Sequence, residues 1–277
     1  MFHFVWSLDP EFARVGSISI RWYSVWTAAA LIIAHHVFRF IWQKEGRRVM
    51  EADFIIVVAV LFSVVGARLG HCLFYHPTYY LAHPMDILKL WQGGLASHGG
   101  FLGLFVGLAL IVGIFSNISF LQLADRFMIS AGIVSVGLRL GNLFNSEIYG
   151  KPTHVPWAII FSRVDEVPRH PTQIYEFVSY AIILAILVGL YKRPKFRTKP
   201  GFILGSALIL YPAFRMVVEF TKEGQSDLDK EWLFSMGQIL SLPFALLGCL
   251  LLMGIQERAP QWFSGHYDLR DAPKKRL

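Results

Sequence analysis

The sequence predicts an all-α, polytopic membrane protein, and two observations lead to this prediction. First, 55% of the 277 residues are hydrophobic and the mean hydropathy is +0.48, so the chain carries more apolar surface than one soluble domain can bury. Second, the apolar residues form about seven runs of the roughly 20 residues that a helix needs to cross the hydrocarbon core. The runs lack the alternation of a membrane β-barrel, and an open sheet would leave backbone groups unpaired in lipid.

The seven predicted helices belong to one membrane-embedded domain, residues 1–277. Their boundaries are expected to hold to about four residues. They span residues 18–41, 53–75, 93–115, 123–145, 173–191, 201–220 and 234–255.

The distribution of basic residues predicts the orientation of the helices. The formal net charge is +7, but the Lys and Arg residues gather in particular loops instead of on one face, which argues against a nucleic-acid partner. The basic segments are 44–48, 192–199 and 258–276. All three lie on the cytoplasmic side if the N-terminus is outside and the C-terminus inside.

Several polar residues then fall in the outer half of the predicted helices. Arg68, Arg139 and Arg215 each cost about 2.5 to 3.5 kcal/mol to place in hydrocarbon, so they require partners, water or an anionic ligand. One interpretation is a shared polar cavity. The alternative is local: Arg68 contacts a carbonyl group, Arg215 pairs with Glu219 one turn on, and the arginines extend to the interface.

Glycines at small-xxx-small spacing indicate close helix packing. They occur at 99, 103 and 107, at 66 and 70, and at 137 and 141. This pattern predicts that the second, third and fourth helices pack together.

Four polar motifs lie at the predicted outer ends of the helices. His98 stands among small residues in GGLASHGGFLG, residues 93–103. Residues 139–150, here called the signature segment, read RLGNLFNSEIYG and concentrate guanidinium, amide and carboxylate groups at a helix end. The other two motifs are RHPTQIYE at 169–176 and RMVVEF at 215–220. Such a density of polar groups is rare in lipid.

These motifs resemble the bacterial prolipoprotein diacylglyceryl transferase family over nearly the whole chain. The resemblance extends to RWY at 21–23, GARLG at 66–70 and SMGQILSLP at 235–243. It implies phosphatidylglycerol as lipid donor, the lipobox cysteine thiol of a prolipoprotein signal peptide as acceptor, and glycerol phosphate as leaving group. No metal or cofactor is expected. This sequence departs from the family pattern at His71, Leu138, Leu143, Lys222, Gly224 and Gln225.

The expected chemistry assigns roles to three residues. The donor phosphate is an anion that suits bidentate guanidinium groups, so Arg139 and Arg215 are the candidates to hold it. His98 is the candidate base for the thiol or the group that orients the donor. The remaining predicted substrate-binding residues are Tyr23, Arg68, Asn142, Asn145, Glu147, Gln173, Tyr175 and Glu219.

Other functions remain as alternatives. A transporter would also hold polar residues within its helices, although the internal repeat that transporters often carry is not found. Another lipid-modifying enzyme with an outer-face cavity is possible. A serine protease is disfavoured because Ser97 and His98 are adjacent on a helix and do not face each other, and a metal hydrolase because no HExxH pair occurs. The expected location is the bacterial inner membrane, with the active site toward the outer leaflet and membrane lipids around it.

The predicted orientation can be tested by cysteine labelling. We expect a cysteine at position 227 to react with an impermeant thiol reagent in intact cells, because the loop between the predicted helices 201–220 and 234–255 is predicted to lie outside. A cysteine at 195, in a basic loop, should not react. The opposite pattern would reverse the topology.

Overall fold

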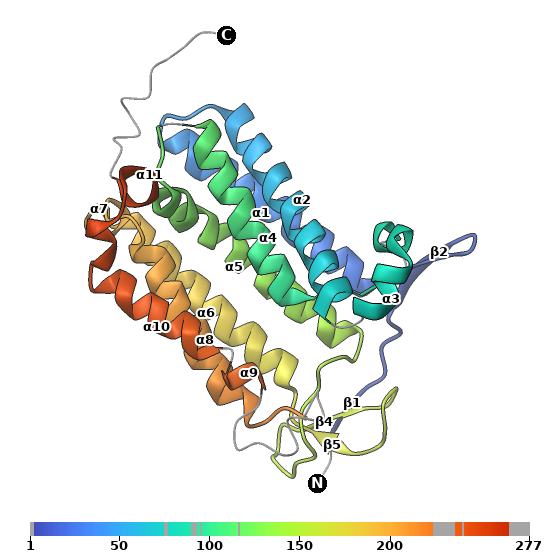
Figure 1. The fold of residues 1–277 in the computed structure, drawn as a ribbon. Coiled ribbons are helices and arrows are strands. Elements are labelled where there is room, and N and C mark those ends of the chain that lie inside the picture. Colours follow the sequence, from blue (N-terminus) through green and yellow to red (C-terminus); the bar gives the residue numbers. More distant parts are fainter. Residues whose placement is uncertain are drawn as a thin grey trace. The chain divides into compact units, whose positions relative to one another are not determined.

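Helices make up most of the chain in the computed structural model (Figure 1). The structure describes residues 3–74, 77–89, 93–94, 96–115, 117–223, 236–239 and 241–265. The chain divides into two compact units: unit 1 comprises residues 1–37 and 125–258, and unit 2 comprises residues 38–124 and 259–277. Each unit is described by itself, and the single domain over residues 1–277 stays a prediction.

Five helices are long and apolar enough to cross a membrane. They are α1 (Trp22–Lys44), α2 (Val49–Phe74), α5 (Phe120–Phe144), α6 (Thr172–Lys192) and α8 (Phe202–Glu219). Two more predicted runs contain the shorter apolar helices α4 (Ser97–Ile114) and α10 (Ser241–Leu252), the latter preceded by α9 (Met236–Ile239). Each predicted run therefore contains a helix, and the predicted all-α polytopic membrane fold is confirmed.

Short helices occupy several connections. These are α3 (Pro77–Ala82), η1 (Pro84–Leu88), α7 (Pro194–Arg197), η4 (Ile255–Arg258) and α11 (Gln261–Ser264). Three of them begin at a proline. Proline is tolerated in the first turn because the N–H that it lacks would have no partner within the helix.

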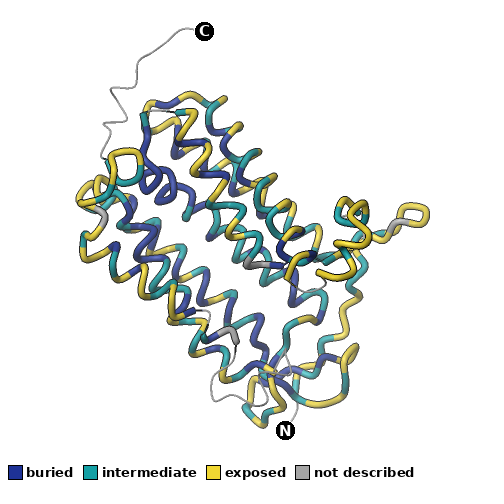
Figure 2. The backbone as a smooth tube through the Cα atoms, viewed as in Figure 1, coloured by how far each residue is buried: buried dark blue, intermediate teal, exposed yellow. Residues whose placement is uncertain are grey.

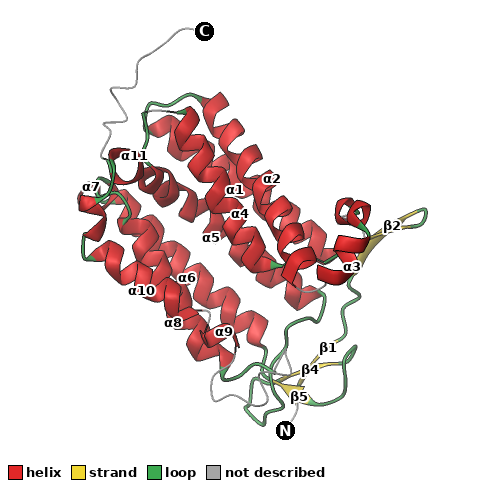
Figure 3. Ribbon diagram, viewed as in Figure 1, coloured by secondary structure: helices red, strands yellow, loops and turns green. Residues whose placement is uncertain are grey.

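Two small sheets in unit 1 were not predicted from the sequence (Figure 3). In the first, β1 (Phe4–Trp6) pairs in parallel with β4 (Ile159–Phe161), and β4 pairs antiparallel with β5 (Pro168–Arg169). The second is an antiparallel hairpin of β2 (Glu11–Val15) and β3 (Ile18–Arg21). Strands of two to five residues are too short to display the alternation that reveals a strand in sequence.

The hairpin corrects the start of the first predicted helix. Residues 18–21 were predicted to be helical, but they pair with β2 as strand β3. Their backbone groups are used by the strand ladder, so α1 begins only at Trp22, whose N–H donates to the carbonyl of Pro10 at 2.9 Å. Gly16, with φ +61°, supplies the left-handed residue of the hairpin turn.

In unit 1, the first part of α1 packs closely on α5. A side chain at Gly137 would overlap the methyl group of Ala30, and a Cβ at Gly141 would lie 2.9 Å from the ring of Tyr23. The Ser130 hydroxyl donates to the carbonyl of Ala34 at 3.2 Å. The glycine pair of the fourth predicted helix therefore contacts the first helix, and the packing of the fourth helix with the second and third stays a prediction.

The buried carboxylate of Asp125 caps the start of α8. Its Oδ2 accepts from the N–H of Gly201 at 2.8 Å, and its Oδ1 accepts from the N–H of Leu204 at 2.7 Å. The first N–H groups of a helix have no partner within the helix and favour a negative charge. Gly201 precedes α8 in the left-handed conformation and has no side chain to cap it, so Asp125 on α5 takes that role.

In unit 2, α2 and α4 touch backbone to backbone through glycines. A Cβ at Gly66 would lie 2.8 Å from the Cα of Gly103, and one at Gly70 would lie 2.8 Å from the Cα of Gly99. The N–H of Ala96, just before α4, donates to the carbonyl of Ala67 at 2.9 Å. The predicted packing of the second helix on the third is confirmed by these contacts.

This glycine contact gives a stability prediction with a matched control. In Gly103→Ala, the new methyl group would overlap the carbonyl oxygen of Phe62, so we expect a loss of about 1 to 3 kcal/mol of stability. In Gly113→Ala, on the same helix, nothing lies within 4 Å of the new Cβ, and stability should be unchanged or higher. Thermal unfolding in detergent compares the two. Equal melting temperatures would contradict the close contact.

Candidate active site

The signature segment leaves α5 through a strained turn. Ile148 has φ 56°, in the left-handed region that is costly for a β-branched residue. Two side chains from the first turn of α6 hold this conformation. The Thr172 hydroxyl donates to the carbonyl of Ile148 at 2.6 Å, and Gln173 Nε2 donates to the carbonyl of Glu147 at 2.7 Å. The start of α6 therefore fixes the end of the signature segment.

Gly150 then joins three stretches of chain. Its N–H donates to the carbonyl of His170 at 2.9 Å, and a Cβ there would lie only 2.5 Å from the carbonyl oxygen of Thr221. The N–H of the next residue, Lys151, donates to that same Thr221 oxygen at 2.9 Å. A glycine is required at position 150 because the backbones approach too closely for any side chain.

Four charged side chains meet where these stretches converge, and we call them the ion-pair network. Glu176 Oε2 lies 3.3 Å from Arg139 Nε, and Glu176 Oε1 lies 2.9 Å from Lys222 Nζ. Lys222 Nζ is also 3.3 Å from Glu219 Oε2. Arg139 Nη1 donates to Asn142 Oδ1 at 3.2 Å. The network joins α5, α6 and the end of α8, all within unit 1.

Burial makes this network energetically important. The side chain of Glu176 is 1% exposed and that of Lys222 is 7% exposed. A lone charge at such a site costs several kcal/mol, whereas two cations and two carboxylates in contact offset each other's desolvation. Buried residues recur along α6 (Figure 2). Those near its start, Glu176 among them, are polar, and most of those further along are apolar.

Arg215 lies differently from Arg139. Its side chain is exposed, and it forms no ion pair or hydrogen bond with another residue in the part of the chain that the structure describes. The alternative pairing of Arg215 with Glu219 is not found, because Glu219 contacts Lys222 instead. The guanidinium of Arg139 is held by Glu176, whereas that of Arg215 has no described counter-charge.

Two members of the network are not among the site residues predicted from the sequence. Glu176 lies in the RHPTQIYE motif, and Lys222 is one of the departures from the family pattern. Glu176 follows Gln173 by three residues, which places both on one face of a helix, and this spacing could have identified it. Lys222 gave no such signal because it lies beyond the end of α8.

Other predicted residues of unit 1 make contacts outside the network. Tyr23 packs on Gly141, and Asn145 Nδ2 donates to Glu147 Oε1 at 3.1 Å. The hydroxyl of Tyr175 accepts from the indole N–H of Trp157 at 2.7 Å and lies 3.1 Å from His170 Nδ1. Partial burial lowers the pKa of His170, so its neutral imidazole is favoured at pH 7.

Arg169 fastens the loops on which the site rests. Its guanidinium donates to Asp165 Oδ2 at 2.6 Å, to Glu223 Oε2 at 2.6 Å and to the carbonyl of Gly150 at 3.2 Å. The hydrogen bond from Arg169 holds the pKa of Asp165 below its usual value. Arg169 opens the RHPTQIYE motif, and these contacts give it a structural role.

Two predicted residues, Arg68 and His98, belong to unit 2. His98 lies in the first turn of α4. Arg68 is 2% exposed, and its guanidinium donates only to backbone carbonyl groups among the residues that the structure describes. The local alternative for Arg68, contact with carbonyl groups, is therefore observed.

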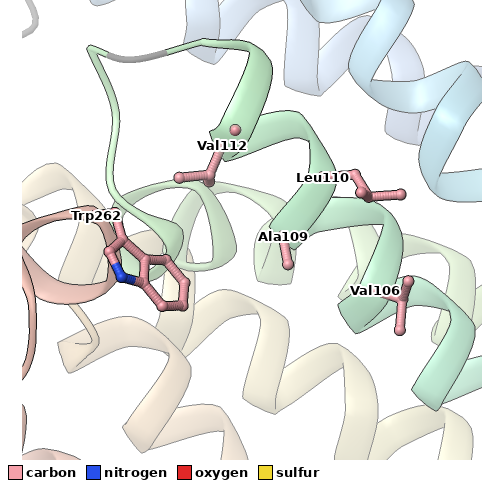
Figure 4. Close-up of a pocket in the computed structure, with 6 residues that line it drawn as sticks. Val106, Ala109, Leu110, Val112 and Trp262 are labelled. Carbon is pink, nitrogen blue, oxygen red and sulfur yellow. The ribbon is translucent and has the colours of Figure 1, made fainter.

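A separate hollow in unit 2 has a different character. It measures about 430 Å³ and is lined by Val106, Ala109, Leu110, Val112, Gly113 and Trp262 (Figure 4). None of the predicted site residues lines it, and its walls offer no charged group for a phosphate. Within the described residues, no three His, Cys, Asp or Glu side chains gather as a metal site would require.

Comparison with known proteins identifies the family. A sequence profile described as "Prolipoprotein diacylglyceryl transferase" matches residues 10–254. The chain belongs to the prolipoprotein diacylglyceryl transferase family. Among its relatives are proteins named phosphatidylglycerol–prolipoprotein diacylglyceryl transferase from Tolumonas auensis (40% identical, covering 92% of this chain and 98% of the relative) and Chloroherpeton thalassium (39%, 89% and 92%). Another is from Bacteroides fragilis (38%, 88% and 92%).

The family assignment confirms the resemblance drawn from the motifs. The profile covers both the signature segment and RHPTQIYE, which together form the turn and supply two of the four side chains of the ion-pair network. In this member of the prolipoprotein diacylglyceryl transferase family, Arg139 of the signature segment and Glu176 of RHPTQIYE are therefore in direct contact.

The ion-pair network predicts a large effect of neutralising its central carboxylate. Glu176→Gln removes the charge that faces both Arg139 and Lys222, so we expect a loss of about 3 to 5 kcal/mol of stability. Glu166→Gln, at an exposed loop position, should change stability by less than about 0.5 kcal/mol. Denaturant unfolding of both variants is the measurement. A Glu176→Gln protein as stable as the control would contradict the role of the network.

Proposed function

We propose that the protein transfers the diacylglyceryl group of phosphatidylglycerol to the lipobox cysteine of prolipoproteins. The cysteine sulfur forms a thioether bond to the glyceryl carbon, the bond from that carbon to the phosphate oxygen breaks, and glycerol phosphate leaves with the electron pair. The observation that carries the proposal is the family match over residues 10–254, together with relatives whose names give phosphatidylglycerol, a prolipoprotein and diacylglyceryl transfer.

Charge stabilisation on the departing phosphate is the largest demand of this reaction. Displacing a phosphate ester from an sp³ carbon builds negative charge on the leaving oxygens, which preorganised cations stabilise best where water is excluded. Arg139 and Arg215 are the proposed groups. Arg139 is held in place by Glu176 and Asn142, and the exposed Arg215 has no described counter-charge to neutralise it.

His98 is proposed to take the thiol proton or to orient the donor. A thiol with a pKa of about 8.5 is only a few per cent ionised at pH 7, a shortfall worth about 2 kcal/mol. Histidine suits this task as a residue type, because the ordinary pKa of an imidazole lies close to neutral pH. Arg139 and Arg215 should contribute at least as much to the rate as His98, since ionising the thiol accounts for the smaller part of the activation barrier.

The glycerol headgroup of the donor is the proposed partner of the polar groups near the signature segment. Asn145 Oδ1, Ser146 Oγ and Gln173 Oε1 are buried and have no hydrogen-bond partner among the described residues. Buried acceptors of this kind require donors, and glycerol hydroxyl groups supply them. Tyr23, Glu147, Tyr175 and Glu219 are the other proposed contacts.

The proposed location is the bacterial inner membrane, with the active site toward the outer leaflet. The seven apolar runs and the alternation of basic loops support this orientation. Both substrates would reach the site from the membrane, since each carries its reacting group on a lipid or a signal peptide.

The activity is tested with purified protein, phosphatidylglycerol and a lipobox peptide. Mass spectrometry should detect the peptide with its diacylglyceryl thioether. His98→Gln should keep the fold and lose most turnover at pH 7. If His98 is the base, the loss shrinks as the pH approaches the thiol pKa, because the thiol then ionises unaided. A loss that persists undiminished at high pH would leave only the orienting role.

Lysine substitutions separate charge from geometry at the two arginines. Arg139→Lys and Arg215→Lys keep the positive charge but lose the planar fork, so single-turnover rates at saturating donor should fall steeply. Arg215→Lys should leave thermal stability unchanged, because Arg215 is exposed and makes no described ion pair. Glu219→Gln should weaken activity less than Arg215→Lys. Near wild-type rates in both lysine variants would exclude the bidentate phosphate role.

A further inference from the structure

Arg68 has a more specific environment than a substrate-binding arginine would need. It lies in α2, six residues before that helix ends at Phe74, and its side chain is buried. Its Nε donates to the carbonyl of Ile87 at 2.9 Å. Its Nη1 faces the carbonyls of Gly93 and Gly94 at 2.5 and 3.3 Å, and its Nη2 faces those of Asp86 and Lys89 at 2.7 and 3.2 Å.

These contacts use the whole hydrogen-bonding capacity of the side chain. A guanidinium has five N–H groups in a fixed plane, and five carbonyl oxygens from the connection between α2 and α4 receive them. The guanidinium carbon also lies 5.3 Å from the ring centre of Tyr80. No N–H group remains for a bidentate contact with a phosphate, so Arg68 is unsuited to binding the donor.

The contacts of Asp86 show that Arg68 recognises the backbone. The carboxylate of Asp86 is occupied by Lys89 Nζ at 2.6 Å and by the Tyr79 hydroxyl at 2.7 Å. Hydrogen bonds from Lys89 and then Tyr79 lower the pKa of Asp86. Arg68 contacts only the main-chain oxygen of this residue, so its charge serves to gather carbonyl dipoles and not to pair with an acid.

Two glycines allow the connection to converge on the guanidinium. Gly93 and Gly94 have φ +80° and +77°, which residues with side chains rarely adopt. A Cβ at Gly94 would lie 2.5 Å from His71 Cδ2 and 3.0 Å from Arg68 Nη1. The backbone at Gly93 and Gly94 therefore fits closely against Arg68, and a side chain at Gly94 would push this backbone away from the guanidinium.

The same stretch of α2 fixes where α4 begins. Ala67, the neighbour of Arg68, accepts the N–H of Ala96 at 2.9 Å, and Gly70 packs on Gly99 in the first turn of α4. His98 lies in that turn. Residues 66–70 of α2 thus hold both the connection and the helix start that follows it.

We propose that Arg68 is a positioning residue that clamps the connection before α4 and thereby sets the placement of His98, without touching substrate. This proposal rests on the proposed function. A displacement of about 1 Å at a catalytic group can cost on the order of 100-fold in rate, so loss of the clamp should lower kcat more than it alters donor binding.

The test combines steady-state kinetics with hydrogen exchange on the purified full chain. In Arg68→Gln, kcat should fall about tenfold or more, while KM for phosphatidylglycerol changes less than about twofold. Amide exchange of residues 84–89 and 96–99 should accelerate. Arg68→Lys, which keeps the charge but has three donors in place of five, should give intermediate exchange and partial recovery of kcat.

Two further variants keep the outcome decisive. Arg47→Gln is the matched control, because Arg47 is also a buried arginine that donates to a backbone carbonyl, that of Asn117, in the same unit. It should leave exchange at 84–89 and kcat unchanged. Gly94→Ala serves if Arg68→Gln folds poorly, and it should also raise exchange and lower kcat. Its control is Gly113→Ala.

A rise of tenfold or more in donor KM with unaltered exchange would overturn the proposal and return Arg68 to donor binding. Unaltered exchange in Arg68→Gln with unaltered kcat would overturn it as well. If the wild-type protein forms no thioether product, the proposed function fails, but the exchange data still report whether Arg68 holds the connection. The two failures are therefore distinguishable.

Discussion

The contact of Glu176 with Arg139 and Lys222 is the interaction on which the candidate site depends. One buried carboxylate faces cations from two other segments, at 3.3 and 2.9 Å, so the end of α5, the start of α6 and the residues after α8 must come together. Charges this buried are stable only in mutual contact, because each alone would be strongly destabilising. The strained turn at Ile148 and the close approach at Gly150 follow from the same convergence.

Backbone contact plays the corresponding part in unit 2. Lipid provides no hydrophobic force between helices, so α2 and α4 associate through glycines that allow close van der Waals contact. The connection between them leaves carbonyl groups that need donors, and Arg68 supplies five. An arginine that is costly in hydrocarbon becomes stabilising here because its partners are main-chain oxygens in fixed positions.

Arg139 and Arg215 have different environments, and the proposed chemistry uses them differently. Arg139 is immobilised by the carboxylate of Glu176. A guanidinium that is already in place needs little reorganisation when negative charge develops on the phosphate, and this stabilises the transition state. Arg215 is exposed and has no counter-charge among the described residues, and it is the second cation proposed for the phosphate. The two proposed cations suit a donor that binds as a phosphodiester anion, because its leaving group, glycerol phosphate, carries more negative charge than the donor itself.

The helical membrane fold, the seven apolar runs and the polar motifs could be predicted from the amino-acid sequence, because hydrophobic length and local composition are properties of contiguous residues. The motifs also pointed to the family. The folded chain was needed to show that Glu176 and Lys222 complete the network with Arg139, that Glu219 pairs with Lys222 and not Arg215, and that Arg68 contacts backbone carbonyl groups. It was also needed to show that a short strand replaces the first turn of the predicted first helix. The contacts of Glu176 and of Arg68 join segments that are well separated in sequence, and a pairing between such segments leaves no periodic signal in either one. The strands of the hairpin are too short to show a periodic pattern of their own.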